Sequence, residues 1–164
     1  MHTPDRPPPL ALDLPTPAET RALGCRLGAA LAPGLVVALE GELGAGKTAL
    51  AKAAIASRGG VDEDDVVSPT FVLAVHYDGD PPLVHLDAYR LAGPAAFVDL
   101  GLEVGASEPA ALVEWADRVA AALPPDRLTV RLEHAPPGRR AILSASGPRS
   151  AAALRAVARA YAAR

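Results

Sequence analysis

Short apolar runs alternate with longer stretches of helical periodicity along this chain. Residues 35–39 and 111–113 are continuous runs of Ala, Val and Leu, which are typical of strands buried on both faces of a sheet. A helical pattern begins after Thr16 and ends at Ala32, because Thr16 is a suitable N-cap and Pro17 suits the first helical turn. The chain therefore predicts a sheet with buried central strands and helices packed against it.

Turn residues divide the rest of the chain into further strands and helices. Two hairpins are predicted, because Asp-Gly-Asp-Pro and Pro-Pro-Gly each separate two strand-like segments. The expected strands are 70–77, 83–87, 127–134 and 139–146, and the expected helices are 47–57, 116–123 and 150–164. Residues 93–108 are weakly patterned and are expected to hold short helices. This order predicts an α/β fold with a mixed, mostly parallel sheet flanked by helices and with antiparallel hairpins.

The composition fits one small domain. Of the 164 residues, 50% are hydrophobic but only 4% are aromatic, so the core is expected to consist mainly of Ala, Leu and Val. The start of the chain is rich in proline, so we expect residues 1–13 to be a flexible tail. The length of the remainder suits one domain, which we expect to comprise residues 14–164. The sequence contains neither the apolar segment of a signal peptide nor a membrane-spanning run, which predicts a cytoplasmic protein that does not enter a membrane.

The charge and the cysteine content narrow the class of protein. A net charge of −3 argues against a dedicated nucleic-acid-binding protein, although it leaves open contact with RNA inside a larger complex. Cys25 is the only cysteine and therefore has no disulfide partner within the chain. Its apolar helical surroundings predict a small buried residue.

Residues 41–48 read Gly-Glu-Leu-Gly-Ala-Gly-Lys-Thr, the G-x-x-x-x-G-K-T pattern of a phosphate-binding loop (P-loop, or Walker A motif). Its glycines let backbone N–H groups approach phosphate oxygens, and the helix that follows presents its positive end to them. Lys47 would reach the β- and γ-phosphates, and Thr48 would offer its hydroxyl to Mg²⁺. The pattern predicts a P-loop NTPase fold that binds ATP and Mg²⁺. The predicted nucleotide-binding residues of this segment are Gly41, Glu42, Leu43, Gly44, Ala45, Gly46, Lys47, Thr48 and Ala49.

Two acidic residues stand at the ends of apolar strands. Asp87 ends the strand 83–87, and Glu114 follows the run 111–113. Because the carboxyl ends of parallel strands meet at one edge of a sheet, both carboxylates are expected beside the loop. Thr48, Asp87 and Glu114 are therefore the candidate metal ligands, and Glu114 could instead orient the attacking water. The alternatives are a turn or cap role for Asp87 and a surface position for Glu114.

The segment Ser68-Pro69-Thr70 lies between the helix after the loop and the next strand. Such a segment can act as a switch that closes a hydroxyl onto the metal or the γ-phosphate. It can equally be an ordinary turn, since Ser-Pro favours turn initiation. With Lys47, Asp87 and Glu114, Thr70 completes the predicted catalytic set.

Other residues could lie near the nucleotide. Trp115 could pack beside it or fill the core, and Arg90 is a candidate arginine finger. Arg139 follows a turn, where it could reach the nucleotide or remain solvated. His76 and His85 are spaced too loosely for a convincing metal site.

Four segments of the chain, in this order, resemble the bacterial TsaE family, also called YjeE. That family comprises small P-loop ATPases of tRNA threonylcarbamoyladenosine biosynthesis. The P-loop alone occurs in many families, whereas the other three segments together are specific. The four are Gly41–Thr48, Ser68-Pro-Thr-Phe71, His85-Leu-Asp-Ala-Tyr-Arg-Leu91 and Val113-Glu-Trp-Ala-Asp117. The resemblance extends over about residues 14–147.

The resemblance implies a nucleotide-dependent role in making N6-threonylcarbamoyladenosine at position 37 of tRNAs that read ANN codons. It implies that the chain works with a TsaB–TsaD heterodimer and meets tRNA only through that complex. By motif, Thr48 and Glu114 would contact Mg²⁺, and Asp87 would be the acid on the metal side. Thr70 would belong to the switch. Thr16 and Pro17 would border the adenine, and Arg139 would approach the nucleotide.

Two other functions stay open at this point. A small-metabolite kinase of the same fold would need a lid, often rich in arginine, but residues 93–108 contain neither Arg nor Lys. A nucleotide-gated binding module, in which hydrolysis is incidental, would carry the same loop. The sequence contains no Asn-Lys-x-Asp run that would select guanine, which favours ATP. We expect slow hydrolysis by the isolated chain, because an arginine finger is worth about 10³–10⁵ in rate and Arg90 is the only candidate.

Overall fold

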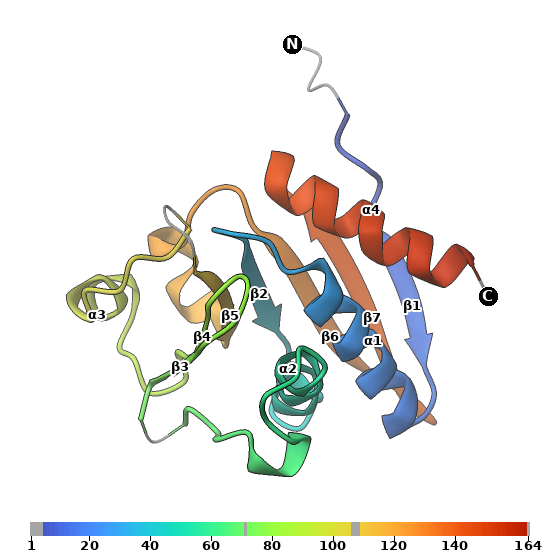
Figure 1. Cartoon of the computed structure of the whole chain (residues 1–164), viewed down its shortest axis with the longest axis horizontal. Helices are drawn as coiled ribbons and strands as arrows, with labels where there is room; N and C mark the ends of the chain where they lie inside the picture. The colour runs from blue at the N-terminus through green and yellow to red at the C-terminus, as the bar shows by residue number, and fades with distance from the viewer. Residues whose placement is uncertain (1–4, 71, 106–108, 164) are drawn as a thin grey trace.

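The computed structural model describes residues 5–70, 72–105 and 109–163, so Phe71 of the Ser-Pro-Thr-Phe segment lies outside the described residues. A seven-stranded sheet with strand order β1-β7-β6-β2-β5-β4-β3 runs through the protein (Figure 1). The strands are β1 (Leu10–Leu14), β2 (Val36–Glu40), β3 (Ala74–Tyr77), β4 (Leu83–Asp87), β5 (Ala110–Glu114), β6 (Leu128–Ala135) and β7 (Gly138–Ala145). The helices are α1 (Pro17–Ala30), α2 (Lys47–Ala56), α3 (Pro94–Asp99) and α4 (Pro148–Ala162), with short 3₁₀ segments η1 (Glu63–Asp65) and η2 (Ala116–Ala122).

The centre of the sheet is parallel and its margins are antiparallel. Strand β2 pairs in parallel with β5 and β6, and β4 pairs in parallel with β5. The pairs β3–β4, β6–β7 and β1–β7 are antiparallel. The predicted mixed α/β fold with two hairpins is thus confirmed.

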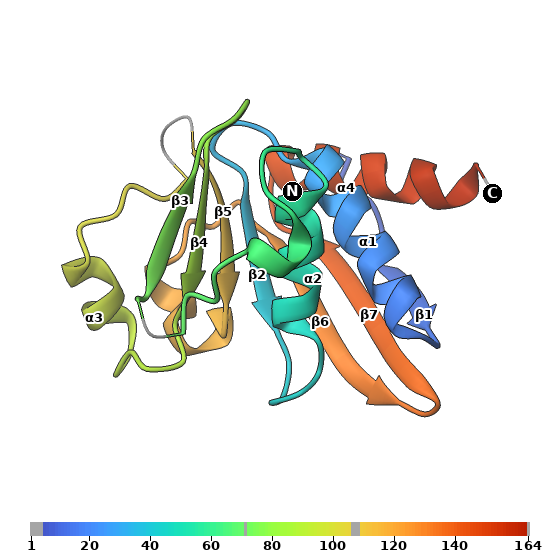
Figure 2. The same cartoon turned by 60° about the horizontal axis from the view of Figure 1, so that its bottom comes forward.

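Alternate residues of the central strands face two different apolar layers. One layer packs the sheet against α1, α2 and α4, and the other packs it against α3 and η2 (Figures 1 and 2). Most buried side chains are Leu, Val and Ala, and Phe97 is the only aromatic residue buried in the core of the described part of the chain. No helix in the described part of the chain is long and apolar enough to cross a membrane.

Helices α1 and α2 approach each other closely through glycine. A Cβ atom on Gly24 would lie 2.6 Å from the Cβ atom of Ala53 and 2.7 Å from the carbonyl oxygen of Leu50. The face of α1 that carries Leu23, Gly24 and Leu27 is therefore buried. Cys25 turns away from it and is exposed, so the prediction of a buried cysteine is wrong.

Part of the stretch expected to be a flexible tail, residues 1–13, pairs with the sheet. Residues 10–14 form β1, in register with β7 from Leu10 opposite Leu143 to Leu14 opposite Arg139. Alternation places Leu10, Leu12 and Leu14 on the sheet face that packs against the core cluster. This apolar face explains why the segment pairs with β7 despite the prolines before it.

Two other element boundaries differ from those predicted. The strand expected from residue 70 begins at Ala74, because the chain turns first: the Leu73 N–H donates to the Pro69 carbonyl at 2.7 Å, and Leu73 has φ 68°. The helix expected at 116–123 is a 3₁₀ segment broken at Val119. The break lies at Val119, whose φ of −127° and ψ of 18° depart from helical values.

Candidate nucleotide site

The P-loop residues connect β2 to α2 at the carboxyl edge of the sheet. Gly46 is the N-cap of α2 with φ 107°, a conformation that favours glycine. Gly41 has φ 148°, and a Cβ atom there would lie 2.6 Å from the Leu132 carbonyl oxygen. No side chain among the described residues caps α2, so its first N–H groups are free to bind an anion.

Lys47 is buried within the loop, with 5% of its surface exposed. Its Nζ donates to the carbonyl oxygens of Gly41 at 2.5 Å and of Glu42 at 3.0 Å. The same Nζ lies 3.9 Å from the centre of the Trp115 ring, a cation–π contact. Burial lowers the pKa of Lys47, and the neighbouring carboxylates, Glu114 above all, oppose that shift. A buried cation therefore stands where the phosphates of a nucleotide would need one.

Asp87 and Glu114 lie opposite each other on the adjacent strands β4 and β5. Both are buried, with 5% and 1% of their surfaces exposed. Glu114 Oε1 accepts a hydrogen bond of 2.5 Å from the Thr48 hydroxyl, and its Oε2 lies 2.7 Å from His85 Nε2. The first turn of α2 is thus tied directly to the end of β5. A surface position for Glu114 is excluded.

The donor atoms at this edge suit Mg²⁺, which prefers oxygen ligands and keeps several of its waters. They are the hydroxyl of Thr48 and the carboxylates of Asp87 and Glu114. Within the described ranges, no group of three His, Cys, Asp or Glu residues could hold a metal by itself. The set therefore fits a cation that is bound jointly by protein and phosphate oxygens.

The Ser68–Thr70 segment contacts Asp87. The Thr70 hydroxyl donates to Asp87 Oδ2 at 3.1 Å and lies 2.9 Å from the Ser68 hydroxyl. The Tyr89 backbone N–H donates to Asp87 Oδ1 at 2.9 Å. Arg90 is exposed, and its guanidinium lies 3.5 Å from the Thr70 carbonyl oxygen. The segment thus forms a turn, as the Ser-Pro reading predicts. It also contacts Asp87, the carboxylate to which the switch reading would couple it.

The start of α1 and the β6–β7 hairpin meet the P-loop at a cavity of about 270 Å³. Thr16 caps α1, accepting a hydrogen bond from the Glu19 N–H, and Pro17 follows in its first turn. Arg139 donates to the Gly44 carbonyl at 2.9 Å. The lining includes Thr16, Pro17, Thr20, Ala45, Gly46, Ala49 and Arg139. Residues predicted from three separate segments thus line one cavity, and their role there stays a prediction.

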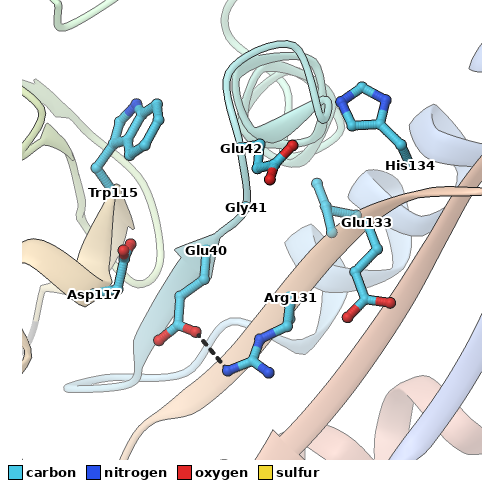
Figure 3. A pocket seen from close by; sticks show the side chains of 9 residues that line it. Glu40, Gly41, Glu42, Trp115, Asp117, Arg131, Glu133 and His134 are labelled. Atoms are coloured by element: carbon cyan, nitrogen blue, oxygen red, sulfur yellow. Dashed lines mark hydrogen bonds and ion pairs between the residues drawn. The ribbon is translucent and has the colours of Figure 1, made fainter.

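A larger cavity of about 540 Å³ lies on another side of the loop (Figure 3). Glu42 and Trp115 border it, and an ion pair of 3.4 Å joins Arg131 to Glu40 in its lining. Its lining is rich in carboxylates, which repel phosphate. The smaller cavity, by contrast, adjoins the start of α2 and has no carboxylate side chain in its lining.

Sequence reasoning missed one contact of the site. It set His85 aside as a metal ligand because of its spacing from His76, whereas the structure joins His85 to Glu114. The register of β4 against β5 creates this contact, and spacing along the chain does not reveal that register.

Comparison with known proteins agrees with these features. A family model described as threonylcarbamoyl adenosine biosynthesis protein TsaE matches residues 14–142. The tRNA threonylcarbamoyladenosine biosynthesis protein TsaE of Streptomyces coelicolor is 46% identical over 122 residues, which are 70% of this chain and 79% of that protein. The protein of the same name from Treponema pallidum is 37% identical over 125 residues, 76% of this chain and 91% of that protein.

The fold also matches a solved structure. The crystal structure of YdiB from Bacillus subtilis has a TM-score of 0.76 and 29% sequence identity, covering 94% of this chain and 97% of that chain. The mixed sheet with a parallel centre is common to both. Together with the family model and the relatives, this match shows that the chain belongs to the TsaE family of threonylcarbamoyl adenosine biosynthesis proteins.

Proposed function

We propose that this member of the TsaE family is a Mg²⁺-dependent ATPase that serves the N6-threonylcarbamoyladenosine modification of tRNA. The observation that carries the proposal is the direct bond between the Thr48 hydroxyl and Glu114, beside the buried ammonium of Lys47. A hydroxyl, two carboxylates and a lysine are the groups that P-loop enzymes use to bind and cleave the terminal phosphate.

Each residue has a distinct task in this proposal. Lys47 exchanges its bonds with the Gly41 and Glu42 carbonyls for bonds with phosphate oxygens. Thr48, Asp87 and Glu114 would hold Mg²⁺, which when bound would neutralise charge that develops on the phosphates. The Thr70 hydroxyl donates to Asp87, so movement of the Ser68–Thr70 segment would be coupled to this carboxylate. Closure of the segment over the nucleotide would then complete the site.

The cavity lined by Thr16, Pro17 and Arg139 would receive the adenine. Its lining is mainly apolar and includes the small residues Ala45, Gly46 and Ala49, which leave room for a flat base. Arg139 already contacts the P-loop at Gly44, so it would lie beside the bound nucleotide.

Hydrolysis by the isolated chain would be slow. Arg90 is exposed, and its guanidinium contacts the Thr70 carbonyl oxygen and not the P-loop. In the proposal, the TsaB–TsaD heterodimer raises turnover by supplying or ordering the missing charge, and tRNA is reached only through that pair.

The test is the rate of ATP hydrolysis by the purified chain with and without the TsaB–TsaD pair. The expected result is a large increase with the pair, and a loss of about 10²–10³-fold for Lys47→Ala. The matched control is Lys52→Ala, which changes the only other lysine, five residues further along the same helix. An unchanged rate on adding the pair would overturn the regulated ATPase.

The same variants decide the biological role. Depletion of the protein from cells should remove threonylcarbamoyladenosine from bulk tRNA, and wild-type protein, but not Lys47→Ala, should restore it. Glu114→Ala separates catalysis from a nucleotide-gated switch: a variant that binds ATP without cleaving it and still restores the modification would show that hydrolysis is incidental.

A further inference from the structure

His85 is a buried titratable group to which the proposed function gives no task. It is 0% exposed, whereas His76 and His134, the other histidines in the described ranges, are exposed. Its Nε2 lies 2.7 Å from Glu114 Oε2. Its Nδ1 is buried and has no hydrogen-bond partner among the described residues. Burial of an imidazole costs free energy unless its polar atoms are hydrogen-bonded, and for His85 only the Nε2 contact offsets that cost.

The register of the parallel strands fixes this contact. Asp87 lies opposite Glu114 and His85 lies opposite Leu112, so His85 and Glu114 are diagonal neighbours. Because alternate residues share a face, all three polar side chains project from the face that carries Leu83 and Leu112. This face packs against α2, whose first turn holds Thr48. His85 therefore lies beneath the site, one layer deeper than the two carboxylates.

The two oxygens of Glu114 are held from two different elements. Thr48 of α2 donates to Oε1 at 2.5 Å, and His85 of β4 occupies Oε2. The tautomer with its proton on Nε2 donates to the carboxylate and leaves Nδ1 as a bare acceptor, which fits the absence of a partner there. With Oε2 engaged, rotation of the carboxylate about its last torsion would break a buried hydrogen bond.

We infer that His85 is a positioning residue, which holds Glu114 so that Oε1 stays directed at the Thr48 hydroxyl and at the cation bound beside it. The inference rests on the proposed function, since it assumes that Glu114 serves a Mg²⁺–nucleotide complex. It assigns His85 no contact with nucleotide or metal. Partners behind metal-ligating side chains commonly alter metal affinity by about 10- to 100-fold.

Three substitutions of His85 test the inference. Gln places an amide nitrogen near the position of Nε2 and can still donate to Glu114. Asn is also polar but is too short to reach Glu114 Oε2, and Leu removes the donor altogether. His76→Gln, at an exposed histidine of β3, is the matched control and should behave as the wild type. Thermal unfolding and circular dichroism of the full chain establish that each variant is folded.

The readout is ADP binding by calorimetry, first in EDTA and then over a series of Mg²⁺ concentrations. We expect His85→Leu and His85→Asn to bind ADP in EDTA within about twofold of wild type. The Mg²⁺ concentration that half-maximally tightens ADP binding should rise about 10- to 100-fold in both, and His85→Gln should restore most of the difference. A purely structural role would lower stability and ADP affinity in EDTA without this selective change.

Two results would contradict different parts of this account. If His85→Asn and His85→Gln respond to Mg²⁺ equally, whether or not His85→Leu folds, the positioning role is wrong. If wild-type protein binds ADP with no response to Mg²⁺, the proposed Mg²⁺-dependent function itself fails, and the inference about His85 falls with it.

Discussion

Asp87 and Glu114 lie opposite each other on paired strands, yet they are held in different ways. Glu114 is fixed from within, between Thr48 of α2 and the buried His85 of β4. Asp87 is held by the Thr70 hydroxyl of a loop and by the N–H of Tyr89 in its own turn. The same edge of the sheet thus presents one carboxylate anchored to packed elements and one bonded to a loop.

This difference suggests a division of labour between the two carboxylates. A residue anchored to packed elements keeps its geometry through the reaction cycle, because packed interiors have few alternative arrangements. A residue bonded to a loop can respond when that loop changes position. We therefore expect Glu114 to define the metal site and Asp87 to link that site to the Ser68–Thr70 segment.

The largest expected effect comes from removing either charge. Asp87→Asn and Glu114→Gln should each lower ATP hydrolysis, measured with the partner pair, by about 10²–10³-fold, because each removes a group that stabilises charge at the phosphates. Glu133→Gln, a strand residue of β6 whose side chain is exposed, is the control and should hydrolyse ATP normally. A mild effect at one of the two positions would mean that only the other serves the metal.

A smaller effect tests the coupling itself. Thr70→Val removes the hydroxyl that donates to Asp87 and should lower hydrolysis about tenfold. In double-mutant cycles, Thr70→Val should couple to Asp87→Ala by more than about 1 kcal/mol but to Glu114→Ala by less than about 0.5 kcal/mol. Thr129→Val, a threonine of β6 outside the site, is the control. Equal coupling to both carboxylates would abolish the distinction between them.

The smallest effect concerns a carboxylate that is purely structural. Asp126 accepts hydrogen bonds from the backbone N–H of Arg149 at 2.8 Å and of Ser150 at 3.0 Å, so it caps the start of α4. Burial would raise the pKa of Asp126, but the hydrogen bonds from Ser150 and Arg149 and the charge of Arg149 outweigh it and lower the pKa. Its contribution to stability is therefore present above the unfolded-state pKa, near 3.9, and is lost as the pH falls through the folded-state pKa.

Asp126→Ala should lower the free energy of unfolding by about 1–2 kcal/mol at pH 7, a typical cost of losing a helix cap. Urea unfolding should show this difference at pH 7 and a much smaller one near pH 2, with ATP hydrolysis at pH 7 unchanged. Asp64→Ala, at an exposed residue of η1, is the control for charge alone. A difference that persists undiminished at low pH would contradict the capping role of the ionised carboxylate.

The sequence could predict the parts of this protein that depend on local chemistry. Glycine spacing identified the P-loop, a cap followed by proline identified the start of α1, and the ends of apolar runs indicated where Asp87 and Glu114 would lie. Each of these signals is contained within a few consecutive residues. The turn residues likewise located both hairpins.

The features that could not be predicted depend on contacts between distant segments. Cys25 is exposed because Gly24, its neighbour, faces α2, which the periodicity of α1 alone does not reveal. Strand β1 forms because the edge of β7 is available to it, more than a hundred residues further along the chain. The role inferred for His85 depends on the register of β4 and β5 in the same way.

The bonds that Lys47 makes with its own loop have a consequence for ligand selectivity. The Gly41 and Glu42 carbonyls act as an internal competitor, since any anion that recruits the ammonium must first replace two charge-assisted hydrogen bonds and a contact with Trp115. Hydrogen bonds to charged groups are worth about 1.5–3 kcal/mol each, so this exchange lowers the affinity of the loop for a simple anion by about an order of magnitude or more. Free phosphate or sulfate offers little in return, whereas a nucleotide polyphosphate also engages the helix N-terminus and the cation. In the proposed function, the loop would therefore select polyphosphates over the abundant small anions of the cell.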